Sequence, residues 1–204
     1  MNPLVGLFFG SFNPLHNGHF KIAEYLLDAG YCTEVWFVVS PQNPWKVDSS
    51  LLEEKKRLEL VTAAIGNDIR MKAVDVEFSM PRPSYTYQTL KVLQGNFPNT
   101  SFALIIGGDN LLRFREWRNA EDILLQFPIL VYPRPGVILA ECLVGNVTLV
   151  DAPLADISST EIRRKVKMGE DISMDVPADI VSLVKCYYRF LPICDECFEG
   201  NYLK

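Results

Sequence analysis

The stretch LVGLFFGSFNPLHNGHFKIAEYLLDAGYCTEVWFVVS, residues 4–40, decides the fold of this chain. It begins and ends with short apolar runs, 4–10 and 34–40, whose β-branched and aromatic residues are typical of strands buried on both faces. Between the runs lies a helical pattern that closes on Gly30, a residue common at helix C-caps. The apolar residues of that pattern are Phe20, Ile22, Ala23, Leu26 and Leu27. The stretch therefore predicts a β-α-β unit.

The same alternation of strands and helices continues along the chain. We expect strands at 71–78, 101–109, 128–134 and 147–153, and helices at 51–66, 84–97 and, in a shorter form, 110–124. The apolar side of the helix at 51–66 is predicted to carry Leu52, Leu58, Val61 and Ile65. Such alternation favours a Rossmann-like, doubly wound α/β fold, with a mostly parallel sheet and helices on both faces. We expect a single domain over residues 1–190, with a small helical part at about 158–190 and a tail at 191–204.

Composition limits the classes of partner. The chain has 204 residues, 49% of them hydrophobic, which is enough for one continuous core. Its formal net charge of −5 argues against a general nucleic-acid or anionic-membrane binder, because those need basic stripes. The N-terminus lacks the basic region and the long apolar run of a signal peptide or membrane span, so we expect a cytoplasmic protein.

The five cysteines show no spacing typical of a disulfide framework, so reduced thiols are the simpler interpretation. Cys194 and Cys197 have C-x-x-C spacing, but a structural zinc needs about four ligands and no second pair or nearby histidine follows. We therefore predict no metal site built from this tail.

Four unusual segments each follow a predicted strand: 10–19, 40–46, 107–109 and 157–163. In open parallel sheets, ligands bind beyond the carboxyl ends of the strands, at a topological switch point. Because all four segments lie at that edge, they can share one pocket.

Both histidines of the chain, His16 and His19, lie in the turn after the first strand. At spacing i and i+3 they can face one side of a helix start, whose free amides and dipole favour an anion. Gly10 and Gly18 would let a phosphate approach the main chain. Structural histidines beside a cap and a two-histidine metal site are the alternatives. The chain has neither a Walker A sequence nor a G-x-G-x-x-G fingerprint.

A second helix start lies at residues 157–163. Ser158 and Glu161 have the spacing of a capping box, and the hydroxyls of Ser159 and Thr160 could point at a triphosphate. Arg163 would add a forked, charge-assisted contact to the same oxygens. A cap alone explains Ser158 and Glu161 but does not explain Arg163.

These two segments carry a family resemblance. GSFNPLHNGH (10–19) resembles the G-[ST]-F-[DN]-P-x-H-x-G-H signature of the nucleotidyltransferase superfamily, whose members transfer AMP or CMP from a nucleoside triphosphate, and ISSTEIR (157–163) matches its second signature. The resemblance implies that His16, His19 and Arg163 are catalytic residues and that Mg2+ is bound through the ATP phosphates. The residues implied to bind ATP are Gly10, Ser11, Phe12, His16, Gly18, His19, Gly107, Asp109, Ile157, Ser158, Ser159, Thr160 and Arg163.

Over nearly the whole chain, the sequence resembles the bacterial nicotinate-nucleotide adenylyltransferases, which make nicotinate adenine dinucleotide from ATP and nicotinate mononucleotide in NAD biosynthesis. The segments that carry this resemblance are SPQNPWK (40–46), SYTYQTL (84–90), GGDNLLRFREW (107–117) and YPRPG (132–136). It implies nicotinate mononucleotide binding by Lys46, Tyr85, Thr86, Tyr87, Trp117 and Arg134. An indole stacks well on a pyridinium ring, although Trp117 as plain core is the competing interpretation.

The sequence departs from the family pattern at position 13, and several alternative functions are open. Position 13 is Asn where many relatives have Asp, which puts any role of a carboxylate there in doubt. Nicotinamide-mononucleotide and phosphopantetheine adenylyltransferases are alternatives within the enzyme class, and a non-catalytic nucleotide sensor is the alternative outside it. We expect ATP and nicotinate mononucleotide as partners, neither nucleic acid nor membrane, and possible homo-oligomers.

Overall fold

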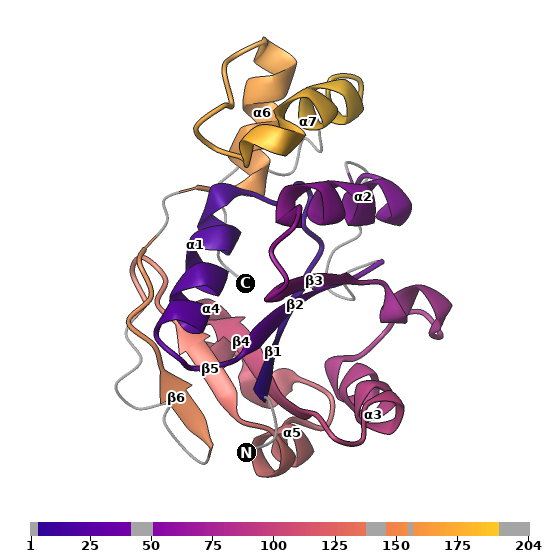
Figure 1. Ribbon diagram of the computed structural model, residues 1–204, viewed down its shortest axis with the longest axis vertical. Helices are drawn as coiled ribbons and strands as arrows, with labels where there is room; N and C mark the ends of the chain where they lie inside the picture. The colour runs from indigo at the N-terminus through magenta and orange to yellow at the C-terminus, as the bar shows by residue number, and fades with distance from the viewer. Residues whose placement is uncertain (1–3, 42–50, 138–145, 155–156, 192–204) are drawn as a thin grey trace.

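A parallel six-stranded sheet forms the centre of the protein in the computed structural model, which describes residues 4–41, 51–137, 146–154 and 157–191. Every pair of neighbouring strands is parallel, and the strand order is β3-β2-β1-β4-β5-β6 (Figure 1). This is the doubly wound order in which the direction of winding reverses between β1 and β4. The strands are β1 (Leu4–Gly10), β2 (Glu34–Val39), β3 (Met71–Val74), β4 (Ser101–Gly107), β5 (Ile129–Tyr132) and β6 (Val147–Leu149). The predicted fold class is confirmed.

Helices cover both faces of the sheet. They are α1 (Asn17–Asp28), α2 (Glu54–Ile65), α3 (Thr86–Asn96), α4 (Gly108–Leu112), α5 (Ala120–Gln126), α6 (Ser159–Met168) and α7 (Val181–Tyr188), with short 3-10 turns η1 (Val76–Ser79), η2 (Phe114–Glu116) and η3 (Ala178–Ile180). In Figure 1, α1 and α2 lie on one side of the sheet and α3 and α5 on the other, while α6 and α7 lie beyond α1 and α2.

Alternate residues of the central strands feed two separate cores, because side chains point to opposite faces of a sheet in turn. Phe8 of β1 belongs to the core that includes residues of α1, α2, α6 and α7, whereas Leu7 of the same strand belongs to the core that includes residues of α3 and α5. The burial of both faces explains why the strands read as continuous apolar runs.

Three predicted elements differ from the structure. The strand predicted at 71–78 ends at Val74, and η1 follows, because Glu77 is drawn into the interior by two hydroxyl donors described below. The edge strand predicted at 147–153 stops at Leu149. The helical stretch predicted at 110–124 is divided into α4, η2 and α5.

The buried face of α2 was predicted only in part, since Val61 is buried as expected whereas the face is centred elsewhere. The structure buries Arg57, Leu60, Val61 and Ala64 of this helix, whereas Leu58 and Ile65 are only half-buried. Leu52 is buried but precedes the helix. The face is rotated because the hydrogen bonds of Arg57 bring a charged residue inside.

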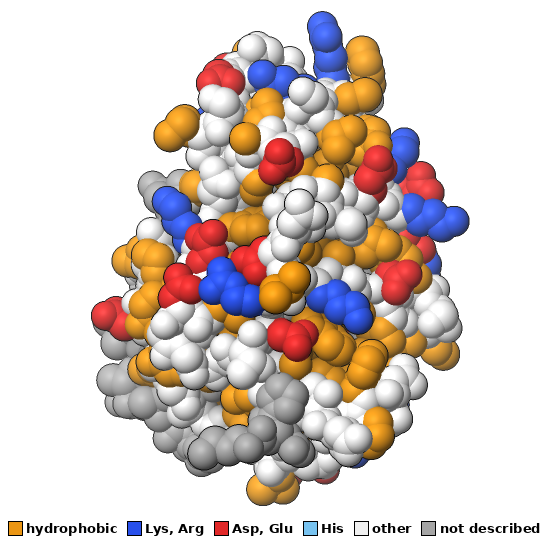
Figure 2. All heavy atoms as spheres, in the orientation of Figure 1, with side chains coloured by type: hydrophobic (Ala, Val, Ile, Leu, Met, Phe, Trp, Pro, Cys, Tyr) orange, Lys and Arg blue, Asp and Glu red, His pale blue; other side chains and the backbone are white. Residues whose placement is uncertain are grey.

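The remaining expectations concern surface charge, membrane spans and cysteines. On the face drawn in Figure 2, acidic and basic side chains are interspersed among apolar ones, and the described residues there form no continuous basic stripe. No helix in the described part of the chain is long and apolar enough to cross a membrane. Cys32 and Cys186 are free thiols, whereas Cys194 and Cys197 lie outside the described residues.

Candidate active site

The turn from β1 into α1 has an unusual backbone that brings its side chains together. Phe12 has a positive φ of 45°, and the Asn13–Pro14 peptide is cis. A Cβ atom added to Gly10 would lie 2.9 Å from the Phe12 ring, so a larger residue would displace that ring. Phe12 is buried against His19, with ring centroids 5.2 Å apart.

The two imidazoles lie side by side at the start of α1. Their centroids are 3.7 Å apart with an interplanar angle of 30°, so they are stacked. The backbone N–H of His16, the N-cap residue, donates to Nδ1 of His19 at 3.3 Å. A ring nitrogen that accepts a hydrogen bond carries no proton, so neutral His19 carries its proton on Nε2. Nδ1 of His16 is buried and has no hydrogen-bond partner among the described residues.

Both histidines are held in the neutral state at pH 7. Burial, with a smaller contribution from the nearby Arg134 cation, lowers the pKa of His16 to about 4, while Asp175 acts weakly in the opposite direction. Burial, then His16 and Arg134, lower the pKa of His19 well below its ordinary value. In the free protein, these imidazoles can therefore each donate one N–H, and the positive charge comes from neighbouring arginines.

The first turn of α6 packs directly on the histidine turn. Ser159 Oγ donates to the carbonyl oxygen of Pro14 at 2.8 Å, and Arg163 Nη1 donates to that of Asn13 at 2.7 Å. Arg163 Nη2 also lies 3.4 Å from Thr160 Oγ1. The expected proximity of segments 10–19 and 157–163 is therefore present in the structure.

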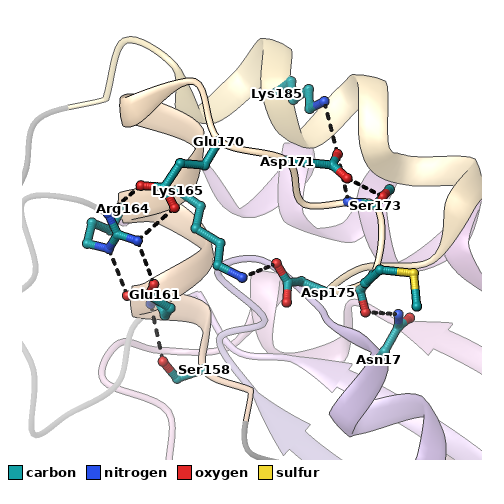
Figure 3. A network of polar contacts seen from close by, with 11 residues as sticks. Asn17, Ser158, Glu161, Arg164, Lys165, Glu170, Asp171, Ser173, Asp175 and Lys185 are labelled. Carbon is teal, nitrogen blue, oxygen red and sulfur yellow. Dashed lines mark hydrogen bonds and ion pairs between the residues drawn. The ribbon is translucent and has the colours of Figure 1, made fainter.

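The predicted capping box forms only in part. Ser158 is the N-cap of α6, and its Oγ accepts the N–H of Glu161 at 3.2 Å. The Glu161 carboxylate instead accepts from Arg164 at 2.8 and 2.9 Å, and Arg164 also reaches Glu170 (Figure 3). Because Arg164 competes for this carboxylate, the reciprocal half of the box is replaced by an ion pair.

The loop after α6 ties the C-terminal helices to the start of α1. Lys165 Nζ lies 2.7 Å from Asp175 Oδ2, and Asn17 Nδ2 donates to the carbonyl oxygen of Met174 at 2.9 Å (Figure 3). The backbone N–H of Asn17 donates to the carbonyl oxygen of Asp175 at 2.8 Å. These contacts hold α6 and α1 in a fixed relation at the histidine turn.

Asn13 has a structural role. Its side chain is 3% exposed, and Oδ1 accepts the N–H of Leu52 at 3.1 Å and the O–H of Tyr188 at 2.8 Å. An amide oxygen and a carboxylate oxygen can both accept these two bonds. The departure noted at position 13 therefore leaves this connection intact.

A cleft and a small hollow lie beyond the carboxyl ends of the strands, and Tyr132 lines both. The cleft has a volume of about 560 Å³ and the hollow one of about 10 Å³, room for about one water molecule. The site residues expected from the sequence that line it are Gly10, Ser11, Tyr85, Thr86, Gly107 and Trp117. The smaller hollow is lined by His16, Gly18, His19, Arg134 and Ile157 among others. The topology thus brings most of the expected residues to one edge of the sheet.

Some expected residues lie elsewhere. Tyr87 is not part of the described cleft wall, since its side chain packs against the core beneath α3. Asp109 does not line the cleft; its Oδ1 is 3.6 Å from Nε of Arg134. Arg134 lies beside the histidines, so its assignment to nicotinate mononucleotide stays a prediction. Lys46 lies outside the described residues.

Gly107 is needed where β4 ends. A Cβ atom there would lie 2.5 Å from Asp109 Oδ1, 3.1 Å from Arg134 Nε and 3.2 Å from the Tyr132 ring. Glycine therefore allows the three side chains to approach the end of the strand.

The sequence analysis missed Arg57, which fixes the backbone under the site. Its side chain is fully buried and donates to the carbonyl oxygens of Leu52 at 2.7 Å, Ser40 at 2.8 Å and Pro41 at 2.9 Å, and also to that of Ser11. Burial lowers the pKa of Arg57. The carboxyl ends of β1 and β2 are thus joined by one guanidinium. The signal was present, because Arg57 falls on the same helical face as Leu60 and Val61.

Glu77 was also missed. It is 2% exposed, lines the cleft, and accepts hydrogen bonds from Ser84 Oγ and Thr89 Oγ1, both at 2.8 Å. Because Ser84 and Thr89 flank the first turn of α3, Glu77 fixes where that helix begins. No pattern in the sequence distinguishes this glutamate from the solvent-exposed ones.

Comparison with known proteins agrees with this arrangement. The sequence profile of the cytidylyltransferase-like family matches residues 7–165. A probable nicotinate-nucleotide adenylyltransferase of Cytophaga hutchinsonii is 48% identical over 88% of this chain and 94% of its own. One of Christiangramia forsetii is 44% identical over 84% of this chain and 90% of its own.

The fold is also similar to a solved structure, that of Plasmodium falciparum nicotinic acid mononucleotide adenylyltransferase complexed with NaAD. The TM-score is 0.77 at 21% identity, covering 93% of this chain and 98% of that chain. That likeness concerns the fold. The relatives at 48% and 44% identity, which cover 88% and 84% of this chain, show that the protein belongs to the nicotinate-nucleotide adenylyltransferase family, a family of nucleotidyltransferase enzymes.

Proposed function

We propose that the protein transfers AMP from ATP to nicotinate mononucleotide, forming nicotinate adenine dinucleotide and pyrophosphate in NAD biosynthesis. The observation that carries this proposal is the cleft of about 560 Å³, whose wall includes Trp117 and, from the segment that also carries both histidines, Gly10 and Ser11. A nucleotide in this cleft and a triphosphate at the histidine turn would bring their phosphates together near Gly10. The names of the curated relatives support the same activity.

The histidine side is suited to the triphosphate. His16 and His19 can each donate one N–H, and Arg134 and Arg163 supply positive charge. The start of α6 adds backbone amides and the positive end of the helix dipole. Phosphate oxygens bound here would accept hydrogen bonds from Arg163, either in place of the carbonyl oxygen of Asn13 or in addition to it. Preorganised donors of this kind stabilise the charge that develops during phosphoryl transfer.

The chemical step needs no nucleophile from the protein. A phosphate oxygen of nicotinate mononucleotide attacks the α-phosphorus of ATP in line, and the bond from that phosphorus to the bridging oxygen breaks. Pyrophosphate leaves with the electron pair. The protein contributes position and charge neutralisation.

The larger cleft is suited to the pyridine nucleotide. Trp117 is half-buried in its wall and offers a flat ring for stacking. Across from it α3 begins at Thr86, whose N–H belongs to the first turn and has no acceptor within the helix. The backbone amides of Thr86 and Tyr87 are therefore proposed to receive the carboxylate of the ring, which requires only the backbone of Tyr87.

Magnesium is proposed to act through ATP. Within the residues that the structure describes, no three His, Cys, Asp or Glu side chains come together as a metal-binding group. The phosphate oxygens of the nucleotide would therefore supply most of the ligands for Mg²⁺, a hard cation that binds substrate phosphates in many enzymes. Bound in this way, the ion neutralises charge on the phosphates.

A pyrophosphate-release assay tests the function. The protein is incubated with ATP, Mg²⁺ and, in separate reactions, nicotinate mononucleotide, nicotinamide mononucleotide or phosphopantetheine. We expect the highest kcat/KM with nicotinate mononucleotide. A higher value with either other acceptor would replace the proposed substrate. ATP binding by calorimetry, without release of pyrophosphate from ATP in the presence of any of the three acceptors, would indicate a nucleotide sensor.

A further inference from the structure

The larger cleft has an uneven distribution of charge. The charged side chains that line its described wall are Glu77, Glu116 and Arg118. Glu77 is buried and occupied by two hydroxyl donors. Glu116 accepts from Arg113 at 2.8 and 3.2 Å, so its negative charge is compensated. Arg118 forms no ion pair within the described ranges. Arg118 is therefore the cation of the described wall, and neither of the two carboxylates there pairs with it.

Arg118 lies where the pyridine ring is proposed to bind. Its guanidinium carbon is 4.9 Å from the centroid of the Tyr85 ring, and Tyr85 is the N-cap of α3. Arg118 follows Trp117 directly, in a turn closed by a hydrogen bond from the N–H of Ala120 to the carbonyl oxygen of Trp117 at 3.2 Å. The cation therefore sits between the proposed stacking surface and the first amides of α3.

We propose that Arg118 is a specificity-determining residue that selects nicotinate over nicotinamide mononucleotide. This inference rests on the proposed function. The two nucleotides differ in a ring carboxylate against a neutral carboxamide, and backbone amides can donate to an oxygen of either group. A guanidinium distinguishes them, because its positive charge attracts the carboxylate. Its N–H groups cannot bind the NH2 group of the carboxamide, since both are hydrogen-bond donors.

The cation–π contact between Arg118 and Tyr85 supports the assignment. A guanidinium in contact with an aromatic ring is restricted in conformation, so less freedom is lost when it binds an anion. The contact involves the face of the aromatic ring and takes up no hydrogen-bond acceptor, so the guanidinium keeps its N–H donors for an anion.

The test compares Arg118→Gln, Arg118→Lys and Arg115→Gln. Arg115 is exposed in η2 and does not line the cleft, so it is the matched control for loss of one positive charge nearby. Steady-state kinetics give kcat/KM for nicotinate and nicotinamide mononucleotide at saturating ATP. Arg118→Gln is expected to lower kcat/KM for nicotinate mononucleotide about tenfold, as for one exposed charge-assisted hydrogen bond.

We expect Arg118→Gln to change the ratio of kcat/KM for nicotinate mononucleotide to kcat/KM for nicotinamide mononucleotide. With Arg118→Gln, kcat/KM for nicotinamide mononucleotide and KM for ATP should stay within about twofold, while Arg118→Lys should keep most of the preference because it keeps the charge. Arg115→Gln should match the wild type. Equal losses for both nucleotides, or an unchanged ratio, would overturn the assignment of Arg118. A wild-type protein inactive with both nucleotides would instead overturn the proposed function.

Discussion

Arg163 and Asn13 are 150 residues apart in the sequence, yet Nη1 of Arg163 donates to the carbonyl oxygen of Asn13 at 2.7 Å. The contact joins the first turn of α6 to the turn that carries both histidines. One arginine thus has two roles to separate by experiment: it supports the turn, and it supplies charge at the proposed triphosphate site.

Replacing Arg163 by Ala should lower kcat by at least about a hundredfold, the size seen when one donor to transition-state charge is removed. The free energy of unfolding should fall by about 1.5–3 kcal/mol, because the charged donor to the carbonyl oxygen of Asn13 is lost. Steady-state kinetics and urea unfolding measure both quantities. Arg164→Ala is the control, because Arg164 pairs with Glu161 and Glu170 at the surface and should leave kcat unchanged. Loss of stability alone in Arg163→Ala would assign Arg163 to structure.

Replacing His19 by Ala should also lower kcat by on the order of a hundredfold or more, because an N–H donor to the phosphates is lost. Circular dichroism should show an unchanged fold. Turnover equal to that of the wild type would remove His19 from the mechanism and leave the stacked pair as a packing feature.

Replacing Trp117 by Ala should raise KM for nicotinate mononucleotide about tenfold or more and leave KM for ATP nearly unchanged, since a stacking surface is removed from one subsite. Initial rates with each substrate varied in turn provide the measurement. Trp36→Phe is a control for losing an indole from the core, because Trp36 packs against Phe97 and Phe102 away from the cleft. Equal changes in both KM values would point to packing.

The free energy of unfolding should decrease as the pH is lowered from about 6.5 towards 4. His16 has a pKa of about 4 in the folded chain against 6.5 in the unfolded chain, so in this window the unfolded chain binds the additional proton. The stabilisation is complete above pH 6.5, and its loss amounts to at most about 3 kcal/mol. The lowered pKa of His19 acts in the same direction.

The variant His16→Gln isolates this contribution. Urea unfolding at pH 7.5 and pH 5 should show a smaller difference in the variant than in the wild type, whatever its absolute stability, because the carboxylates titrate in both proteins. Equal pH dependence in the two proteins would contradict a neutral, buried His16.

Replacing Arg57 by Met should reduce the free energy of unfolding by about 3 kcal/mol or more, because the buried carbonyl oxygens of Leu52 and Pro41 lose their donor. Chemical denaturation provides the measurement, and Lys56→Met, an exposed neighbour on α2, should change stability by less than about 0.5 kcal/mol. A neutral effect of Arg57→Met would mean that water can replace the guanidinium.

The sheet was predictable because strands buried on both faces leave a continuous apolar pattern. The two signature segments were predictable because unusual residues such as His16 and Arg163 stand out beside ordinary elements. Arg57 was missed because a charged side chain is assigned to the surface unless its partners are known, and its partners here are carbonyl oxygens, which every residue has. Glu77 was missed for a related reason, since its two hydroxyl partners become neighbours only when the chain folds.

The position of Arg118 could not be predicted from the sequence for another reason. Its sequence neighbours give no sign that the ring of Tyr85, at the start of α3, would contact it. Whether such a side chain faces solvent or a substrate depends on how η2 and α3 pack, which local patterns do not determine.

The hydrogen bond from Tyr188 to Asn13 has a consequence for biosynthesis. Its two ends are separated by 175 residues, so at about 5–20 residues per second a ribosome makes the second partner roughly 10 to 35 s after the first. Throughout that interval the turn at Asn13 lacks the hydroxyl of Tyr188. For most of the interval the turn also lacks Arg163, which donates to the carbonyl oxygen of Asn13. The proposed ATP site is therefore incomplete until residue 188 has been made, and ATP binding there would stabilise only chains that already include that residue.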